Sequence, residues 1–177
     1  KIDIHIQDYR HITGKYNKIV SIEMLEAVGD KYHHSFFSKC AEVLTPRGLL
    51  GIQMITVPDC RYQSLKKGVD WIQRHIFPGS LLLSVGRVND VLSDTGDLFM
   101  HHLEDIGADY AHTLSIWHDN FNNQLAQIKA LGFDDSFIRT WNYYLKYCEA
   151  GFATRNISVV QAIYTRPNNS MLHRSFS

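Results

Sequence analysis

The chain has 177 residues, 45% of them hydrophobic, and its 18 Lys and Arg balance 18 Asp and Glu. This length favours one domain with a sizeable core over two domains. The balanced charge gives no electrostatic reason to expect nucleic acid as a partner. No apolar run approaches the ~20 residues that a membrane-spanning helix needs. We therefore expect a single cytoplasmic domain that touches a membrane from one side at most.

Neither the cysteines nor the histidines form a pattern typical of a disulfide framework or a metal site. The three cysteines are odd in number and far apart in the sequence: Cys40, Cys60 and Cys148. The neighbours His33 and His34, like His101 and His102, lack the i, i+4 spacing that lets two imidazoles of one helix bind one ion. We therefore expect free thiols and no metal.

In chain order, the first predicted elements are strands. The isoleucines of KIDIHI, residues 1–6, alternate with polar residues and predict a strand with one buried face. The segment KIVSIEM, residues 18–24, predicts a strand buried on both faces. A helical pattern from about residue 30 to 44 follows, and LLGIQMITV, residues 49–57, predicts the next strand. This order indicates a right-handed βαβ unit in a parallel sheet.

The second half of the chain is mainly helical by its periodicity. Residues 58–80 are less regular and contain one short predicted helix, in VDWIQRHIFPG. The elements predicted after it are a helix over 85–94, a strand in LFMHHLEDIG (98–107), long helices over 111–131 and 135–155, and a strand in ISVVQAIYTR (157–166). The tail from residue 168 to 177 predicts little order.

Two carboxylates, Glu23 and Glu26, come where the strand at 18–24 is expected to end. Ligands of open α/β sheets lie at this edge, which favours a functional role. Acids at the start of a helix are also favoured by its dipole, so the pattern leaves both interpretations open. Tyr110, in EDIGADYAHT, again follows a strand, although a tyrosine packed beneath a capped turn is the favoured local interpretation.

Six segments match one family in order: YNKIVSIEMLEAVG, FFSKCAEVLTPRGLLGIQMITVPD, IQRHIFPGS, HLEDIGADYAHTLSIWHDNF, ALGFDDSFIRTWNYYLKYCEAGF and ISVVQAIYTRP. They resemble the carboxyl-terminal part of the cyclopropane-fatty-acyl-phospholipid synthases and the related mycolic acid cyclopropane synthases. The resemblance implies an α/β fold with a Rossmann-like methyltransferase sheet, helical insertions and an antiparallel strand pair at the carboxyl end. It also implies S-adenosylmethionine as methyl donor, a bound bicarbonate as base, and methylene addition across a cis double bond of a lipid acyl chain.

The same resemblance implies roles for individual residues. Glu26 matches the glutamate that holds bicarbonate, Tyr110 a tyrosine ligand, and Ile55 a backbone contact to the ion. Gln53 stands where the family commonly has a histidine, and its amide can donate a hydrogen bond but cannot carry a proton. Cys148 matches a cysteine near the active site, although as a small buried hydrophobe on a helix it would have no catalytic role. The residues implied on the cofactor side are Gln7, Asp8, Tyr9, Ser21 and Glu23.

The glycine-rich cofactor loop of this family has no counterpart here, because the sequence contains no GxGxxG run. The resemblance therefore implies that residues 1–167 form the carboxyl-terminal part of one domain, truncated at the N-terminus so that the first two strands are missing. We expect this chain alone to bind S-adenosylmethionine weakly and to transfer no methyl group. The strand at 18–24 would have an unpaired edge, filled either by a second copy, giving a homodimer, or by residues 2–6.

Three functions are compatible with the sequence. The first is cyclopropanation of an unsaturated phospholipid acyl chain, with peripheral membrane contact. The second is S-adenosylmethionine-dependent methylation without ring closure or on another acceptor, which Gln53 in place of histidine keeps open. The third is a noncatalytic dimerisation module that retains the fold.

Overall fold

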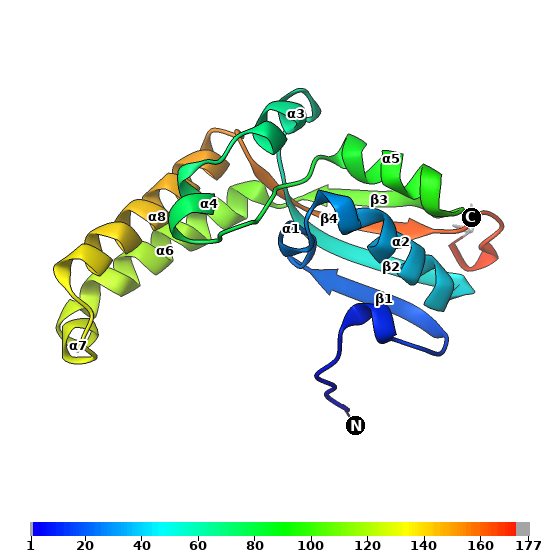
Figure 1. Cartoon of the computed structure of the whole chain (residues 1–177), viewed down its shortest axis with the longest axis horizontal. Coiled ribbons are helices and arrows are strands. Elements are labelled where there is room, and N and C mark those ends of the chain that lie inside the picture. Colours follow the sequence, from blue (N-terminus) through cyan, green and yellow to red (C-terminus); the bar gives the residue numbers. More distant parts are fainter. Residues whose placement is uncertain (1, 173–177) are drawn as a thin grey trace, which may run out of the picture.

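A four-stranded mixed sheet organises the chain in the computed structural model, which describes residues 2–172 (Figure 1). β1 (Tyr16–Ile22) is parallel to β2 (Leu44–Thr56). β4 (Ser158–Thr165) is antiparallel to β2 on one side and to β3 (Phe99–Asp105) on the other. The order is therefore β1-β2-β4-β3. A parallel pair joined by a helix and an antiparallel pair at the carboxyl end confirm the predicted α/β class.

The helices agree with the sequence patterns except in three places. They are α1 (Leu25–Val28), α2 (His33–Val43), α3 (Asp59–Lys67), α4 (Trp71–His75), α5 (Val85–Thr95), α6 (Gly107–Asn123), α7 (Leu125–Ala130) and α8 (Asp135–Ala153), with 3-10 turns at Tyr9–His11, Asp30–Tyr32 and Ser170–Leu172. The short α1 lies before the helix predicted from about residue 30, and α3 was not predicted within the irregular stretch 58–80. The single helix predicted over 111–131 begins earlier, at Gly107, and breaks at Gln124, whose φ of −114° and ψ of 16° are not helical.

Residues 2–8 do not form the predicted opening strand. They have no regular secondary structure, and Ile2, Ile4 and Ile6 are 89%, 90% and 105% exposed. Alternation describes the two faces of a strand but does not supply a neighbouring strand to pair with. The predicted docking of this segment on the edge of β1 is therefore wrong for this structure, and pairing of that edge with a second copy stays a prediction.

β1 is an edge strand and is not buried on both faces, which corrects the prediction for residues 18–24. Val20 and Ile22 are 69% and 59% exposed, whereas Ser21, on the opposite face, is buried. A continuous apolar run shows that both faces could be covered, but covering the second face requires another element that the run does not specify. Within residues 2–172, only β2 pairs with β1.

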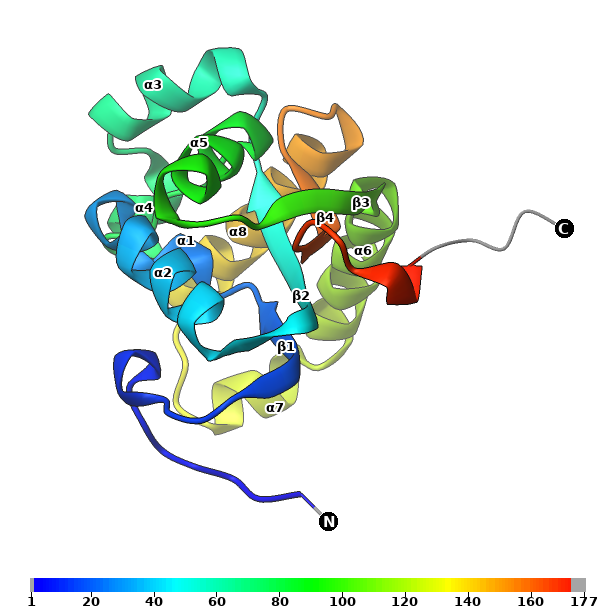
Figure 2. The same cartoon turned by 90° about the vertical axis from the view of Figure 1, so that its right-hand side faces the viewer.

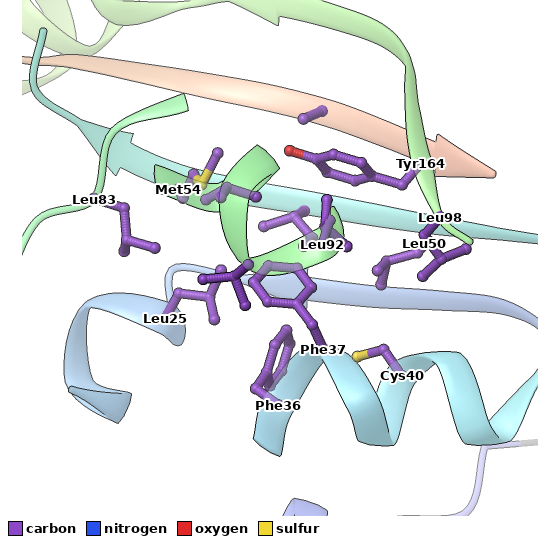
Figure 3. Packing of buried hydrophobic residues seen from close by; sticks show 14 of the residues in the cluster. Leu25, Phe36, Phe37, Cys40, Leu50, Met54, Leu83, Leu92, Leu98 and Tyr164 are labelled. Carbon is purple, nitrogen blue, oxygen red and sulfur yellow. The ribbon is translucent and has the colours of Figure 1, made fainter. Parts of the chain in front are cut away.

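The main hydrophobic core fills the space between the sheet and helices α2 and α5 (Figure 3). Alternate residues of β2, such as Leu50 and Met54, meet Phe37 of α2 and Leu92 of α5 there. Each fully buried side chain of this kind contributes about 1.5–3 kcal/mol. Figure 2 shows α2 and α5 on one side of the strands and α6 on the other. The core thus holds β2 rigidly by one face and leaves its other face for α6 and α8.

A second, smaller core joins α6 and α8 to the sheet near the end of β2. It is formed by Leu114 of α6, Leu145 and Phe152 of α8, and Val159 of β4. The two helices run side by side and extend beyond the sheet (Figure 1). Within the described residues, no helix is both long and apolar enough to cross a bilayer.

The described part of the predicted tail, residues 168–172, packs against the sheet. Asn169 is buried, and its side-chain nitrogen donates to the carbonyl of Arg47 at 3.1 Å and to Thr165 Oγ1 at 2.9 Å. The remainder of that tail, residues 173–177, lies outside the described residues.

Gly107→Ala tests the junction that starts α6. A Cβ at Gly107 would collide with Ser158 Oγ, which is held by a hydrogen bond to Asp105 Oδ1. We expect a loss of about 1–3 kcal/mol in the free energy of unfolding, measured by urea denaturation. Gly68→Ala is the matched control, because its Cβ would meet only ordinary contacts of 3.6 Å or more. Equal stability of the two variants would contradict the close packing at Gly107.

Candidate active site

A cavity of about 570 Å³ lies beyond the carboxyl ends of β1 and β2. α1, α4, the start of α6 and the end of α8 gather on this side of the sheet (Figure 1). Five of the residues singled out in the sequence line it: Glu23, Glu26, Ile55, Tyr110 and Cys148. Most of the remaining lining is apolar or aromatic. The fold therefore brings residues from four separate segments to one enclosed surface.

Glu26, in α1, is a buried acid with an incompletely satisfied carboxyl group. Its exposure is 8%, and Oε1 accepts a hydrogen bond of 2.5 Å from the backbone N–H of Ile55. Oε2 is buried and has no hydrogen-bond partner among the described residues. Burial raises the pKa of Glu26; the Ile55 N–H opposes the rise and the nearby charge of Glu23 adds to it. The group is therefore more easily protonated than an ordinary glutamate, and its Oε2 can share that proton with a ligand.

Glu23 sits in a strained turn and accepts hydrogen bonds at both oxygens. Its φ of 47° is uncommon for a residue with a side chain, and its N–H donates to the Gln53 carbonyl at 2.9 Å. Gln53 Nε2 donates to Glu23 Oε1 at 2.8 Å, and the Tyr110 hydroxyl donates to Oε2 at 3.4 Å. Both donors are neutral side chains, so Glu23 has no cationic partner in these contacts.

Gln161 completes this network, and no sequence pattern singled it out. Its Nε2 donates to Gln53 Oε1 at 2.8 Å, which turns the Gln53 amide so that its nitrogen faces Glu23. The pairing register places Gln161 of β4 directly opposite Gln53 of β2. Only the register between distant strands carries this information, so no local pattern could have found the residue.

Tyr110, Tyr144 and Cys148 keep their protons at neutral pH. Burial, with a smaller contribution from the charge of Glu23, raises the pKa of Tyr110 to about 12. Burial likewise raises the pKa of Tyr144 to about 12 and that of Cys148 to about 11. Tyr110 is therefore a hydrogen-bond donor, whereas Cys148 lacks the thiolate that nucleophilic catalysis requires.

Three of the residues implied on the cofactor side lie away from this cavity. Asp8 caps the 3-10 turn at Tyr9–His11 and forms an ion pair of 2.6 Å with Arg10. Gln7 Nε2 donates to the His11 carbonyl at 2.6 Å. Tyr9 borders a second hollow of about 370 Å³, and Ala27 lines both hollows. The two hollows are therefore neighbours, with α1 between them.

Ser21 lines neither hollow. Its Oγ is buried on β1 and has no hydrogen-bond partner among the described residues. Ser21 belongs to β1 and lies two residues before Glu23. Its predicted contact with the cofactor stays a prediction.

Glu26→Gln tests the burial of this acid through the pH dependence of stability. The pKa of Glu26 is higher in the folded chain than its ordinary value of 4.5, so ionisation opposes folding as the pH rises above 4.5. We expect the variant to gain on the order of 1 kcal/mol over the wild type at pH 8, and the gain to shrink toward pH 4.5. Urea unfolding at both pH values measures it.

Glu104→Gln, at an exposed position of β3, is the control and should change stability by less than about 0.5 kcal/mol at either pH. A Glu26→Gln variant that is less stable at pH 8 than at pH 4.5, relative to wild type, would contradict the raised pKa.

Comparison with known proteins points to one family. Residues 1–162 match the family model of mycolic acid cyclopropane synthetase. The chain is 35% identical over 161 residues to the tuberculostearic acid methyltransferase UfaA1 of Mycobacterium tuberculosis, covering 91% of this chain and 38% of that protein. It is 31% identical over 166 residues to the cyclopropane-fatty-acyl-phospholipid synthase of Escherichia coli K12, covering 93% and 41%. The chain thus spans about two fifths of the length of these relatives.

Solved structures agree on the fold. The cyclopropane synthase MmaA2 from Mycobacterium tuberculosis has a TM-score of 0.78 and 22% identity, covering 89% of this chain and 58% of that one. The mycolic acid cyclopropane synthase CmaA1 complexed with SAH and CTAB has a TM-score of 0.77, with the same identity and coverage. At this identity the likeness establishes a Rossmann-like methyltransferase fold.

Proposed function

Because this chain belongs to the mycolic acid cyclopropane synthetase family, we propose that it forms the acceptor side of an S-adenosylmethionine-dependent site that transfers one carbon to an unsaturated lipid acyl chain. The observation that carries the proposal is the composition of the cavity. An apolar wall, suited to a hydrocarbon chain, meets a buried acid whose Oε2 lacks a partner. An acyl chain held in a bilayer also implies peripheral contact with the membrane.

S-adenosylmethionine would supply an electrophilic methyl group, and bicarbonate a base for the proton that must leave if a ring closes. The residues present fit the anion. A carboxylate beside bicarbonate would repel it, but the raised pKa of Glu26 allows a protonated carboxyl to donate from Oε2. Tyr110 keeps its hydroxyl proton and would provide a second donor on the same wall once it leaves its 3.4 Å hydrogen bond to Glu23.

The cavity walls would exclude water from a cationic acyl intermediate. Tyr110, Tyr144 and Phe152 line the cavity, and the Tyr110 and Phe152 rings lie 4.7 Å apart. Ring faces attract cations, and a dry site prevents capture of the cation by water. Cys148, as a neutral thiol in the same wall, contributes packing.

Methylation of an acyl chain without ring closure is the second candidate, and the Gln53 contacts favour it. The amide of Gln53 is held between Glu23 and Gln161 and cannot take up a proton. The N–H of Ile55, implied as a contact to the ion, is used by Glu26 in this structure. Consistent with this candidate, one relative is named as a tuberculostearic acid methyltransferase.

Lipid mass spectrometry on cells that express the complete gene, as wild type or Glu26→Gln, tests the proposal. We expect unsaturated phospholipid acyl chains to gain the mass of one CH₂ in the wild type, with a loss of at least about tenfold in the variant. Ozonolysis separates the candidates, because a cyclopropane product resists cleavage and a methylated alkene does not. Lipids unchanged in both strains would refute lipid modification and favour the noncatalytic module.

Cofactor binding by the chain alone gives an independent test. The sequence lacks a glycine-rich loop, and Tyr9 and Glu23 border different hollows. We expect titration calorimetry with S-adenosylmethionine to give a dissociation constant well above the micromolar range. Tyr9→Ala is the companion variant and should abolish any residual binding at the smaller hollow. A micromolar dissociation constant for S-adenosylmethionine in the wild-type chain would contradict the expected weak binding.

A further inference from the structure

The cavity has two glutamates near one end and an arginine near the other. Glu23 and Glu26 stand where β1 ends, and Arg61 of α3 stands beyond the end of β2. Among the described residues that line the cavity, Arg61 is the one permanently charged cation. The wall also contains these aliphatic side chains: Ile55, Val57, Leu65, Ile72, Leu82, Leu114 and Ile157. A molecule with a charged head and a hydrocarbon chain would match this arrangement.

The Arg61 side chain is held in place by the segment that follows α8. Its Nη1 donates to both the backbone carbonyl and the side-chain Oδ1 of Asn156, each at 2.9 Å. Asn156 Nδ2 in turn donates to Thr154 Oγ1 at 2.8 Å, and both residues line the cavity. These contacts use one nitrogen of the guanidinium, so its other N–H groups are available to a ligand. Arginine orders carboxylates and phosphates well because it presents a planar fork of donors.

The strand register separates Arg61 from the acids. Gln53, which contacts Glu23, pairs with Gln161, and Ile55, whose N–H contacts Glu26, pairs with Val159. These two residues of β4 lie five and three positions along the chain from Asn156, the partner of Arg61. At ~3.3 Å per residue along an extended chain, the separations are on the order of 10–15 Å. The two ends of the cavity can therefore hold different parts of one ligand.

Asp70 is the acid of the cavity wall that could compete for Arg61. Its Oδ1 accepts a 2.8 Å hydrogen bond from the Gln73 N–H at the start of α4. The ion pairs of the described residues include none between Asp70 and Arg61. Among these residues, no salt bridge therefore occupies the Arg61 guanidinium.

We propose that Arg61 binds the anionic head of an amphiphile, a carboxylate or a phosphate, whose hydrocarbon chain lies in the cavity and points toward Glu26. The inference rests on the proposed function and adds the orientation of the substrate. Guanidinium binds such heads through two parallel hydrogen bonds. The other end of the cavity offers no guanidinium or ammonium group among its described lining residues, so the reverse orientation would lose these hydrogen bonds.

Titration calorimetry of the chain with decanoate, decanol and inorganic phosphate, each below its aggregation limit, tests the proposal. Decanoate and decanol share one hydrocarbon chain and differ in head charge. We expect decanoate to bind roughly tenfold more tightly than decanol, because the head gains charge-assisted hydrogen bonds. Phosphate alone should show no measurable binding, since it lacks the chain that the cavity buries.

Arg61→Gln should lower decanoate affinity to that of decanol and leave decanol binding unchanged. Arg61→Lys should keep part of the preference for decanoate over decanol. This variant, together with a thermal melt of each variant, shows whether a loss of binding comes from misfolding. Arg74→Gln removes an exposed arginine of α4 that does not line the cavity and should keep the full preference.

The outcomes separate the two levels of inference. Equal binding of decanoate and decanol by the wild type, or a preference that survives in Arg61→Gln, would overturn the role of Arg61 and leave the lipid function standing. Phosphate binding that Arg61→Gln abolishes would show a site for a small anion and overturn the amphiphile. Failure of both amphiphiles to bind would refute the lipid function and this inference with it.

Discussion

The pairing of β2 on both sides is the constraint on which the rest of the structure depends. Parallel pairing with β1 brings Glu23 and Glu26 to the end of β2, where Gln53 and the Ile55 N–H meet them. Antiparallel pairing with β4 brings Gln161 opposite Gln53 and places Asn156 beyond the same end. The buried face of β2 packs against α2 and α5, which fixes the strand relative to these helices. Both ends of the cavity are thereby built from one strand and its two neighbours.

The burial of Glu26 sets stability against function. A carboxyl group removed from water with one oxygen unpartnered costs free energy, and the one hydrogen bond from the Ile55 N–H satisfies only the other oxygen. Natural proteins retain such costs mainly at sites where the group does chemistry. Glu23, in contrast, accepts a hydrogen bond at each of its two oxygens. Two acids three residues apart thus have different environments, set by the strained turn between them.

The candidate site was predictable to the extent that its residues belong to recognisable segments. Glu26, Ile55, Tyr110 and Cys148, selected through the resemblance, line one cavity, while their chemical roles remain proposals. Gln161 and Arg61 were missed because their importance comes from a strand register and from a contact to a residue 95 positions away. No periodicity or spacing within a segment records contacts of that kind.

The sequence by itself determined the local structure: β-branched runs became strands β1, β2 and β4, and amphipathic patterns became helices α2, α5, α6 and α8. These outcomes depend on side-chain periodicity and on interactions between near neighbours. Tertiary structure decided which strands found partners and which faces were covered. Residues 2–6 alternate like a strand yet form no regular secondary structure, and β1 is apolar yet lies at an edge. Strand pairing and burial both require a second element that meets the first. The pattern within one segment describes only that segment's own faces.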